Sequence, residues 1–595
     1  MKQFIDALVV ANESKVTRLL AILRAIQAQY HHIPAAAITQ LAELLHIPRT
    51  QIIGVIEFYS FFHLQPQGEY EILLSDSITD HMLGQKPLLA YFAAQLNVVV
   101  GQVRADGLVS LNTTSCTGMC DQGPAGLVNG YPLTRLDKAR IDQIAALIEQ
   151  RVPISAWPAT LLQVDDNVKQ PGLLLTDPLV QGAAIKAVLE RGATASLAEI
   201  DRSGLRGRGG AGFKTAMKWK FCAEETADQH YVVCNADEGE PGTFKDRVLL
   251  QSYAHEVFEG MTVCAAIIGA TQGFMYLRGE YLYLHAALEA VLAERRAAGL
   301  LGDKILGSEL AFDIEICLGA GAYICGEESA LIESLEGKMG VPRNRPPYPV
   351  TYGYLGKPTV VNNVETFLAA AKIAVHGGAW FAAVGTEKSQ GSKILSICGD
   401  CAQPGIYEYA FGTSIQRILD DCGAEDVLGV QIGGPSGTFI AQREFGRKLA
   451  FEDLATGGSF IVFNSSRNIL DIVHNFTHFF AHESCGFCTP CRVGTSLLQK
   501  QIDKIVEGHG SAGDVAALEE LCQLVKNNSH CGLGQTAANP ILSTLERYPE
   551  LYQGCLKQIS YEPGFDLDGA LATARRMAQR NDAGAHLAQV GEDHE

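Results

Sequence analysis

Four cysteines near the C-terminus constrain the fold of this chain more than any other feature. Cys485, Cys488 and Cys491 stand in the run Glu-Ser-Cys-Gly-Phe-Cys-Thr-Pro-Cys-Arg, and Cys531 stands in Ser-His-Cys-Gly-Leu-Gly. Three thiolates in C-x2-C-x2-C spacing, joined by a distant fourth, are typical ligands of a [4Fe–4S] cluster. The chain is therefore expected to fold so that Cys531 lies beside the other three, and to move electrons one at a time.

The composition is that of a globular protein with several domains. The chain has 595 residues, of which 47% are hydrophobic and 19% charged, and about 150 residues per domain predicts about three to five domains. A net charge of −19 argues against nucleic acid and against an anionic membrane surface. No run approaches the ~20 apolar residues of a membrane span, and we recognise no signal peptide. We therefore expect a cytoplasmic protein with reduced thiols and no membrane insertion.

The N-terminal part predicts two small domains. Residues 1–65 have apolar residues at helical spacing, from Val16 to Ile26, and predict a helical bundle in which new helices begin after Pro34 and Pro48. Residues 66–150 predict a thioredoxin-like domain with a strand at 69–74, a helix at 86–96, a strand at 107–113, a hairpin turning at Asn129-Gly130 and a closing helix at about 138–150. Residues 151–170 lack a clear period and are expected to form a linker.

The remaining chain predicts an α/β multidomain fold. Strands and helices alternate over residues 171–385, which indicates a layered α/β domain. Shorter strands with turn residues predict a small β domain over 386–462, and helices are expected around the four cysteines over 463–565. Residues 566–595 are expected to form a polar tail.

A glycine-rich segment, residues 203–213, indicates an anion site. It holds five glycines and two arginines, Arg206 and Arg208, and continues into a helical segment. Glycine lets backbone N–H groups approach a phosphate, and the amides at a helix N-terminus favour the same ligand. Gly207, Gly209 and Gly212 fit G-x-G-x-x-G, although no buried strand precedes them, so the ordinary dinucleotide fingerprint is not expected. The alternative is a flexible surface loop.

Other polar segments of the α/β domain predict a ligand site. An acidic loop over 234–242 follows one strand, and a glycine-rich acidic turn over 319–329 follows another. Residues 343–349 hold arginines and a tyrosine between prolines, and residues 362–366 offer amides. Each segment alone is more often a solvated turn. Together they predict a site at the carboxyl ends of the strands, where α/β folds place ligands.

These motifs, taken in order, resemble the flavin subunit of respiratory complex I over about residues 170–560. The resemblance implies that NADH is oxidised on FMN and that electrons leave through the [4Fe–4S] cluster. Residues 1–150 resemble the thioredoxin-like subunit of complex I, fused in front, and residues 386–462 resemble a ubiquitin-like β-grasp insert. The fused layout resembles the diaphorase subunits of NAD-reducing nickel–iron hydrogenases.

The resemblance assigns site residues position by position. FMN is expected against Gly207, Arg208, Gly209, Gly210, Gly212, Lys218, Asn235, Asp237, Gly326, Glu327, Asn362 and Asn363. NADH is expected near Phe213, Phe221, Glu238, Glu240, Glu328, Arg345 and Tyr348, with the three aromatic residues as walls and Arg345 as a charge partner. Hydride transfer needs no general base, so no acid–base residue is assigned.

The resemblance also implies partners. The chain has no paired C-x-x-C motifs typical of a nickel site, so the chemistry H2 + NAD+ = NADH + H+ would need a separate [NiFe] hydrogenase module, reached through a ferredoxin-like iron–sulfur subunit. Three further enzymes stay open: a fused complex I subunit, the diaphorase of a soluble NAD-dependent formate dehydrogenase, and an electron-bifurcating hydrogenase subunit. A non-catalytic scaffold is the alternative from another class.

The thioredoxin-like domain departs from its family. That family holds a [2Fe–2S] cluster with C-x4-C and C-x3-C pairs, and only the second pair, Cys116 and Cys120, is present. Ser75 and Asp80 occupy the first pair. Oxygen ligands are harder than thiolates and suit the cluster less well. We therefore expect no [2Fe–2S] cluster here, a structural role for the domain, and core positions for scattered cysteines such as Cys422.

Overall fold

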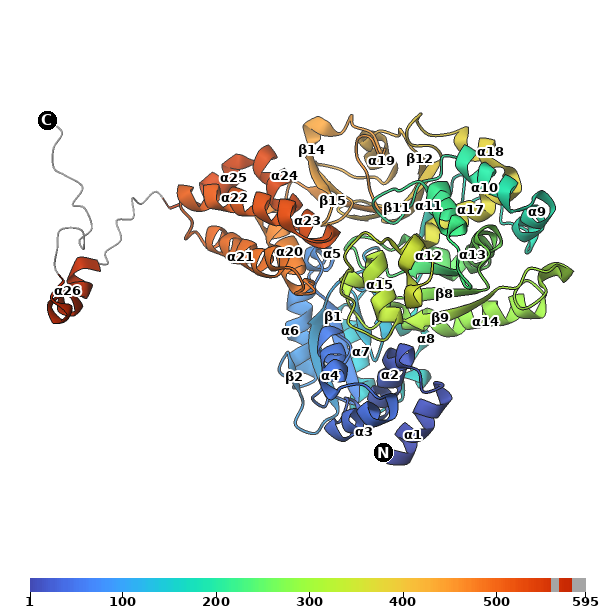
Figure 1. Cartoon of the computed structure of the whole chain (residues 1–595). Helices are drawn as coiled ribbons and strands as arrows, with labels where there is room; N and C mark the ends of the chain where they lie inside the picture. The colour runs from blue at the N-terminus through green and yellow to red at the C-terminus, as the bar shows by residue number, and fades with distance from the viewer. Residues whose placement is uncertain (558–566, 581–595) are drawn as a thin grey trace.

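The computed structural model describes residues 1–557 and 567–580. Figure 1 shows the N-terminal helices and the thioredoxin-like domain in blue, beside a central α/β block in green, with a β domain and the C-terminal helices in orange and red beyond it. The predicted fold class, a mixed α/β multidomain protein, is confirmed.

The N-terminal bundle consists of α1 (Lys2–Ala11), α2 (Leu19–Tyr30), α3 (Ala35–Leu45) and α4 (Arg49–Phe58). As predicted, α3 and α4 begin directly after Pro34 and Pro48, because proline favours the entry to a helix. The buried face of the bundle shares one hydrophobic cluster with Phe274 and Tyr276 of the central block. The bundle therefore covers a sheet face that would otherwise meet water.

The thioredoxin-like domain holds a five-stranded sheet in the order β2-β3-β1-β4-β5. Its strands are β1 (Tyr70–Ser75), β2 (Gln102–Val103), β3 (Val109–Thr114), β4 (Gly126–Val128) and β5 (Tyr131–Leu133), with helices α5 (Ile78–Met82), α6 (Gln85–Gln95) and α7 (Lys138–Glu149). The predicted hairpin turns at Asn129 and Gly130, whose φ angles are +48° and +82°. This left-handed pair is what an Asn-Gly turn favours.

The segment 151–170, expected to be a linker, is packed instead. Trp157 stacks on Tyr70 with ring centroids 6.2 Å apart, and its indole N–H donates to the carbonyl of Val152 at 2.8 Å. The short strand β6 (Val168–Gln170) joins the sheet of the β domain beside β12. The elements of the segment 151–170, including η2 (Ile154–Ala156) and α8 (Ala159–Leu162), are too short to show a hydrophobic period in the sequence.

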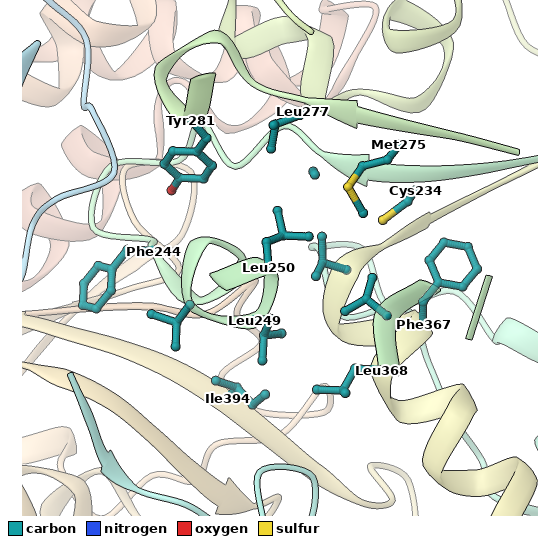
Figure 2. Packing of buried hydrophobic residues seen from close by; sticks show 14 of the residues in the cluster. Cys234, Phe244, Leu249, Leu250, Met275, Leu277, Tyr281, Phe367, Leu368 and Ile394 are labelled. Atoms are coloured by element: carbon teal, nitrogen blue, oxygen red, sulfur yellow. The ribbon is translucent and has the colours of Figure 1, made fainter. Parts of the chain in front are cut away.

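The central block is built on a parallel sheet in the order β10-β7-β8-β9. These strands are β10 (Thr359–Asn363), β7 (Tyr231–Ala236), β8 (Gln272–Leu277) and β9 (Asp313–Leu318). Alternate residues face opposite layers, as the pleat requires: Met275 and Leu277 join the cluster of α13 (Ala254–Ile268) and α17 (Val364–His376), whereas Tyr276 faces the N-terminal bundle. Figure 2 shows Met275 and Leu277 across this core from Phe367 and Leu368 of α17.

Six strands make up the sheet of the β domain, in the order β14-β13-β15-β11-β12-β6. Its first and last major strands, β11 (Ser392–Gly399) and β15 (Ser459–Asn464), lie parallel at the centre. The others are β12 (Gly405–Ala410), β13 (Val427–Ile432) and β14 (Thr438–Ala441), with helix α19 (Ile415–Asp421). This arrangement is that of the expected β-grasp domain.

The C-terminal helices are α20 (Ile469–His482), α21 (Thr489–Val506), α22 (Ala512–Asn528), α23 (Gly532–Thr536), α24 (Asn539–Arg547) and α25 (Pro549–Gly554). The tail expected over 566–595 contains α26 (Leu567–Ala578), and the rest of that tail falls largely outside the described residues. Among the helices of the described ranges, none combines the length and apolarity needed to cross a bilayer.

Candidate functional site

The four C-terminal cysteines meet as predicted. Cys485 and Cys488 lie between α20 and α21, Cys491 is in the first turn of α21, and Cys531 directly precedes α23. All four line one pocket, together with Ile324, Pro342, Ser484, Phe487, His530 and Leu533. Burial raises the pKa of Cys491 to about 12 and that of Cys531 to about 11. Four thiols around one pocket fit an iron–sulfur cluster, whose binding would displace their protons.

The glycine loop runs between α10 (Ala193–Arg202) and α11 (Thr215–Glu224) and presents open backbone. Gly209 and Gly210 are exposed, and a Cβ at Gly210 would have no atom within 4 Å. A Cβ at Gly209 would lie 3.1 Å from the Cβ of Asn363. Gly212 has a φ of +65°, so the turn into α11 favours glycine. Gly207 closes the loop, because its N–H donates to the carbonyl of Phe213 at 2.9 Å.

Arg208 does not present its charge to this open backbone. Its side chain is buried and lies over the rings of Phe411 and Phe451, 4.9 and 5.8 Å from their centroids. Its guanidinium donates to the carbonyl of Gln390 at 3.2 Å, and burial lowers its pKa to about 10. The side chain thus joins the loop to the β domain, and only the backbone of Arg208 is left near the ligand side.

Polar side chains gather at the carboxyl edge of the sheet. Asn235, near the end of β7, pairs with Asn363 of β10. The side-chain amide of Asn235 donates to the carbonyl of Gly326 at 2.8 Å. Asn362 accepts from the indole N–H of Trp219 at 2.8 Å. Asp237 follows β7, and burial raises its pKa well above the usual range. Its Oδ2 has no hydrogen-bond partner among the described residues, so a ligand donor would satisfy it.

Charged side chains link three segments beside this edge. Glu327 caps α15 (Glu328–Leu335) by accepting from the N–H groups of Ser329 and Ala330. Lys218 of α11 donates to Glu328 at 2.7 Å and to the carbonyl of Val361 at 3.0 Å. The guanidinium of Arg345 lies 3.2 Å from Glu327 and 3.8 Å from Glu328. The structure therefore brings these predicted residues together.

The side chains of the three predicted aromatic walls are all exposed to solvent. Phe213 is 50% exposed, Phe221 43% and Tyr348 54%. Phe213 precedes α11 and Phe221 lies within it, and α11 packs against α16 (Pro349–Tyr352), which begins directly after Tyr348. Met217 and Tyr352 are also exposed and were missed. The i, i+4 spacing of Met217 and Phe221 was the available signal, and exposed aromatic faces suit a planar ring.

The two acidic-loop glutamates differ in what they face. Glu240 accepts from the hydroxyl of Tyr323 at 2.5 Å and from the N–H of Ser436 at 2.8 Å, and burial raises its pKa to about 6. Glu238 accepts from the N–H groups of Asp246 and Arg247 at 2.8 and 3.2 Å. Its carboxylate thereby caps α12 (Lys245–Ser252) instead of facing the ligand side, and burial raises its pKa to about 7.

Two residues of α12 support the site and were missed by sequence. Asp246 accepts from the amide of Asn363 at 2.6 Å, and Lys245 donates to the oxygen of the same amide at 3.1 Å. Lys245 also lies 3.2 Å from the buried Glu365. Hydrogen bonds therefore hold both the nitrogen and the oxygen of the Asn363 side-chain amide. No sequence signal marked these residues beyond their place after the acidic loop.

The thioredoxin-like domain has no open ligand set. Asp80 accepts from the hydroxyls of Ser75 and Ser77 at 2.5 and 2.8 Å and from the N–H of Ala125 at 2.8 Å. The sulfurs of Cys116 and Cys120 lie 3.2 Å apart and are buried. Burial raises the pKa of Asp80 to about 6. Because hydrogen bonds already use both carboxylate oxygens, these residues do not fit a [2Fe–2S] cluster.

Three family models match the chain. They are the Nuo51 FMN-binding domain at residues 200–372, the thioredoxin-like [2Fe-2S] ferredoxin at 5–149, and the iron-sulfur binding region of NADH-ubiquinone oxidoreductase-F at 471–554. The glycine loop, acidic loop and strand ends fall in the first, and the four cysteines fall in the last.

Curated relatives and solved structures agree with these matches. The NAD-reducing hydrogenase HoxS subunit alpha of Cupriavidus necator is 44% identical over 93% of this chain and 95% of its own length. An NADH-quinone oxidoreductase subunit of Escherichia coli is 38% identical over 60% of this chain and 84% of its own. A chain of an NAD+-reducing [NiFe]-hydrogenase solved in the H2-reduced state superposes with a TM-score of 0.87 at 42% identity, covering 98% of this chain and all of that one.

Proposed function

Because the chain belongs to the family of NAD-reducing hydrogenase alpha subunits, we propose that it is the diaphorase of such an enzyme. It transfers hydride reversibly between NAD(H) and FMN and exchanges single electrons with partner subunits through one [4Fe–4S] cluster. A ferredoxin-like iron–sulfur subunit and a [NiFe] hydrogenase module are the proposed partners. The match over 93% of the chain, against 60% for the NADH-quinone oxidoreductase relative, favours this assignment over a complex I role.

One segment carries the proposal, because it belongs to both sites. Residues Tyr323–Gly326 form η5, whose Gly326 accepts from Asn235 at the strand ends. Ile324 of the same short helix lines the pocket of the four cysteines. His530, the neighbour of Cys531, bonds the carbonyl of Arg343 at 3.1 Å. The strand-end site and the cysteine pocket are therefore neighbours, which would let an electron pass from one to the other.

The residues of the chain bind and orient; none needs to act as an acid or base. FMN, when bound, accepts the hydride as an electron pair and releases electrons singly. We assign its phosphate to the open backbone of Gly209 and Gly210, and its polar ring edge to Asn235, Asp237 and Asn362. The further flavin contacts proposed are Gly207, Gly212, Lys218, Gly326, Glu327 and Asn363. Arg208 would contribute through its backbone alone.

NADH is assigned to the exposed aromatic surface beside the strand ends. Phe213, Phe221 and Tyr348 offer flat faces for its rings, and Arg345 offers a positive charge. Glu328, which accepts from Lys218, and Glu240, which accepts from the hydroxyl of Tyr323, are the further proposed contacts of the nucleotide. Glu238 would act by holding α12 in place.

The proposed compartment is the cytoplasm. All sixteen cysteines are free, which suits a reducing environment.

A flavin spectrum tests the proposal directly. The purified full chain is expected to bind FMN and to lose its yellow absorbance when NADH is added without air. Asn363→Ala should lower the FMN content, because it removes an amide fixed from both sides, whereas Asn12→Ala, directly after α1 in the N-terminal bundle, is the matched control. A chain that binds FMN but is not bleached by NADH would be a scaffold, and the proposal would be wrong.

A further inference from the structure

Two loops from different domains share the same anchors. The cysteine loop, residues 116–121, belongs to the thioredoxin-like domain, and the acidic loop, residues 234–242, belongs to the central block. Arg278, which follows β8, is buried between them. One arm of its guanidinium donates to the carbonyl of Glu238, and the other donates to the carbonyl of Cys116 at 2.7 Å. A single side chain thus bridges the two loops.

Tyr281 is the second anchor. Its hydroxyl donates to the carboxylate of Glu238 at 2.9 Å. Gly118 of the cysteine loop has a φ of +77°, and a Cβ there would lie 2.3 Å from this hydroxyl oxygen. The backbone of the cysteine loop therefore packs directly on the group that holds Glu238. Figure 2 shows the ring of Tyr281 on the side of the core where Phe244, the residue before α12, also lies.

Arg247 is the third anchor. Its backbone N–H donates to Glu238 at 3.2 Å, while its side chain donates to the carbonyl of Gly118 and to Asp121, each at 3.1 Å. A second bond to Asp121 measures 3.0 Å. Neither charged side chain is exposed. A buried pair that keeps its hydrogen bonds on both sides leaves little freedom to the backbone that carries it.

The anchored loop continues to the ligand side. Glu238 caps α12, and Asp246 and Lys245 of that helix fix the amide of Asn363. Arg278 and Asp237 also line one pocket with Thr114 and Ser115 of the thioredoxin-like domain. An unbroken set of contacts therefore runs from the cysteine loop to the residues assigned to FMN.

We propose that Arg278 and Tyr281 are positioning residues for the hydride-transfer site, and that the cysteine loop of the thioredoxin-like domain completes their support. This inference rests on the proposed function, since it takes the acidic loop and Asn363 to lie at the site of hydride transfer. It gives the N-terminal domain a part in catalysis without any metal.

Tyr281→Phe is the sharpest test, because it removes one hydroxyl and no charge. Its matched control is Tyr283→Phe on the same short helix, whose hydroxyl has no partner among the described residues. Tyr281→Phe should raise KM for NADH about threefold or more, as loss of one hydrogen bond to a carboxylate implies. As pH is lowered, the decrease of kcat/KM should also begin at a higher pH in Tyr281→Phe than in wild type. The reason is that the Tyr281 hydroxyl favours the ionised form of Glu238, which Asp246 and Lys245 also face.

Gly118→Ala tests the same contact from the other domain. It places a methyl group against the Tyr281 hydroxyl, whereas Gly107→Ala, at a φ of +73° with open space around it, imposes similar backbone strain without a contact. Gly118→Ala should raise KM as Tyr281→Phe does, and the double variant should show less than the sum of the two changes. Arg278→Lys, which keeps the charge but loses the two-armed bridge, should have the largest effect.

Hydrogen exchange supplies a readout independent of turnover. In the full chain before flavin is added, the amides of Asp246 and Arg247 should exchange about tenfold faster in Tyr281→Phe and Gly118→Ala than in their controls. If both variants match their controls in KM, pH profile and exchange, the proposal is overturned, even where the melting temperature falls. If wild-type chain fails to accept hydride while the exchange differences persist, the proposed function fails and the positioning of α12 stands.

Discussion

The two cysteine sites of this chain differ in what occupies the space between their ligand positions. At the C-terminal site, four thiols from two segments line one pocket, where the hydroxyl of Ser484 lies 3.3 Å from the sulfur of Cys491. At the N-terminal site, Asp80 is bonded to Ser75, and the sulfurs of Cys116 and Cys120 touch at 3.2 Å. The C-terminal arrangement leaves its four thiols around a pocket that fits a cluster, whereas in the N-terminal arrangement hydrogen bonds already use both carboxylate oxygens of Asp80.

The difference shows how hydrogen bonds can link segments that a cluster would otherwise join. A cluster joins strand ends and loops by metal–sulfur bonds, and its removal leaves those segments unlinked. Here the hydroxyls of Ser75 and Ser77 and the N–H of Ala125 all converge on Asp80, so hydrogen bonds link the segments instead. The cost is a buried carboxyl group whose ionised form is disfavoured.

The largest expected effect sharpens the comparison at the C-terminal site. Cys488→Ser should leave reduction of FMN by NADH intact but slow electron transfer to the partner subunits more than about 100-fold, because even changes outside the ligand shell of a metal site cost about 10- to 100-fold. Cys555→Ser, which alters a thiol outside the pocket, is the matched control. Transfer at the normal rate in purified Cys488→Ser would show that the cluster is held elsewhere.

A smaller effect, on stability, is expected at the N-terminal site. Burial raises the pKa of Asp80 from 3.8 to about 6, so the folded state favours the protonated carboxyl. Its contribution is therefore fully present below pH 3.8 and is lost as pH rises through about 6. Asp80→Asn, which stays neutral, should gain stability relative to wild type across this window, by up to about 3 kcal/mol near pH 7.

Chemical denaturation of both chains at several pH values measures this change. Asp142→Asn, at an exposed aspartate of α7, is the matched control. A wild-type chain that is instead stabilised relative to Asp80→Asn as pH rises would mean that the carboxylate is ionised and bound, as a metal ligand would be.

Local chemistry made much of the fold predictable. The turn at Asn129-Gly130 and the helices that begin after Pro34 and Pro48 depend on the residues at those positions alone. The packing of 151–170 was missed because Trp157 is ordered by Tyr70, which lies far away in sequence. A short segment without hydrophobic periodicity gives no sign of a packing partner that lies far away in the sequence.

The site was predictable in its residue types and places but not in its side-chain directions. Asn235 and Asn363 lie together because they end neighbouring parallel strands, which the strand pattern implies. Arg208 and Glu238 turn away from the ligand side because distant residues, such as Phe411 and Arg247, receive them. A position in a motif does not determine which of two competing partners a long side chain takes.

The smallest effect is expected from removing the two thiols of the N-terminal site, and a large effect would contradict the difference drawn between the two cysteine sites. Cys116→Ala with Cys120→Ala removes the remaining thiols of the N-terminal site, and iron content, cluster spectra and NADH turnover of the full chain should stay within about twofold of wild type, because no ligand is lost. Stability should fall by about 1–2 kcal/mol, since two buried sulfurs leave small cavities. Cys491→Ala is the comparison variant and should lose iron. Iron loss from the Cys116/Cys120 variant would mean that both sites hold metal, and that the hydrogen bonds of Asp80 form only in its absence.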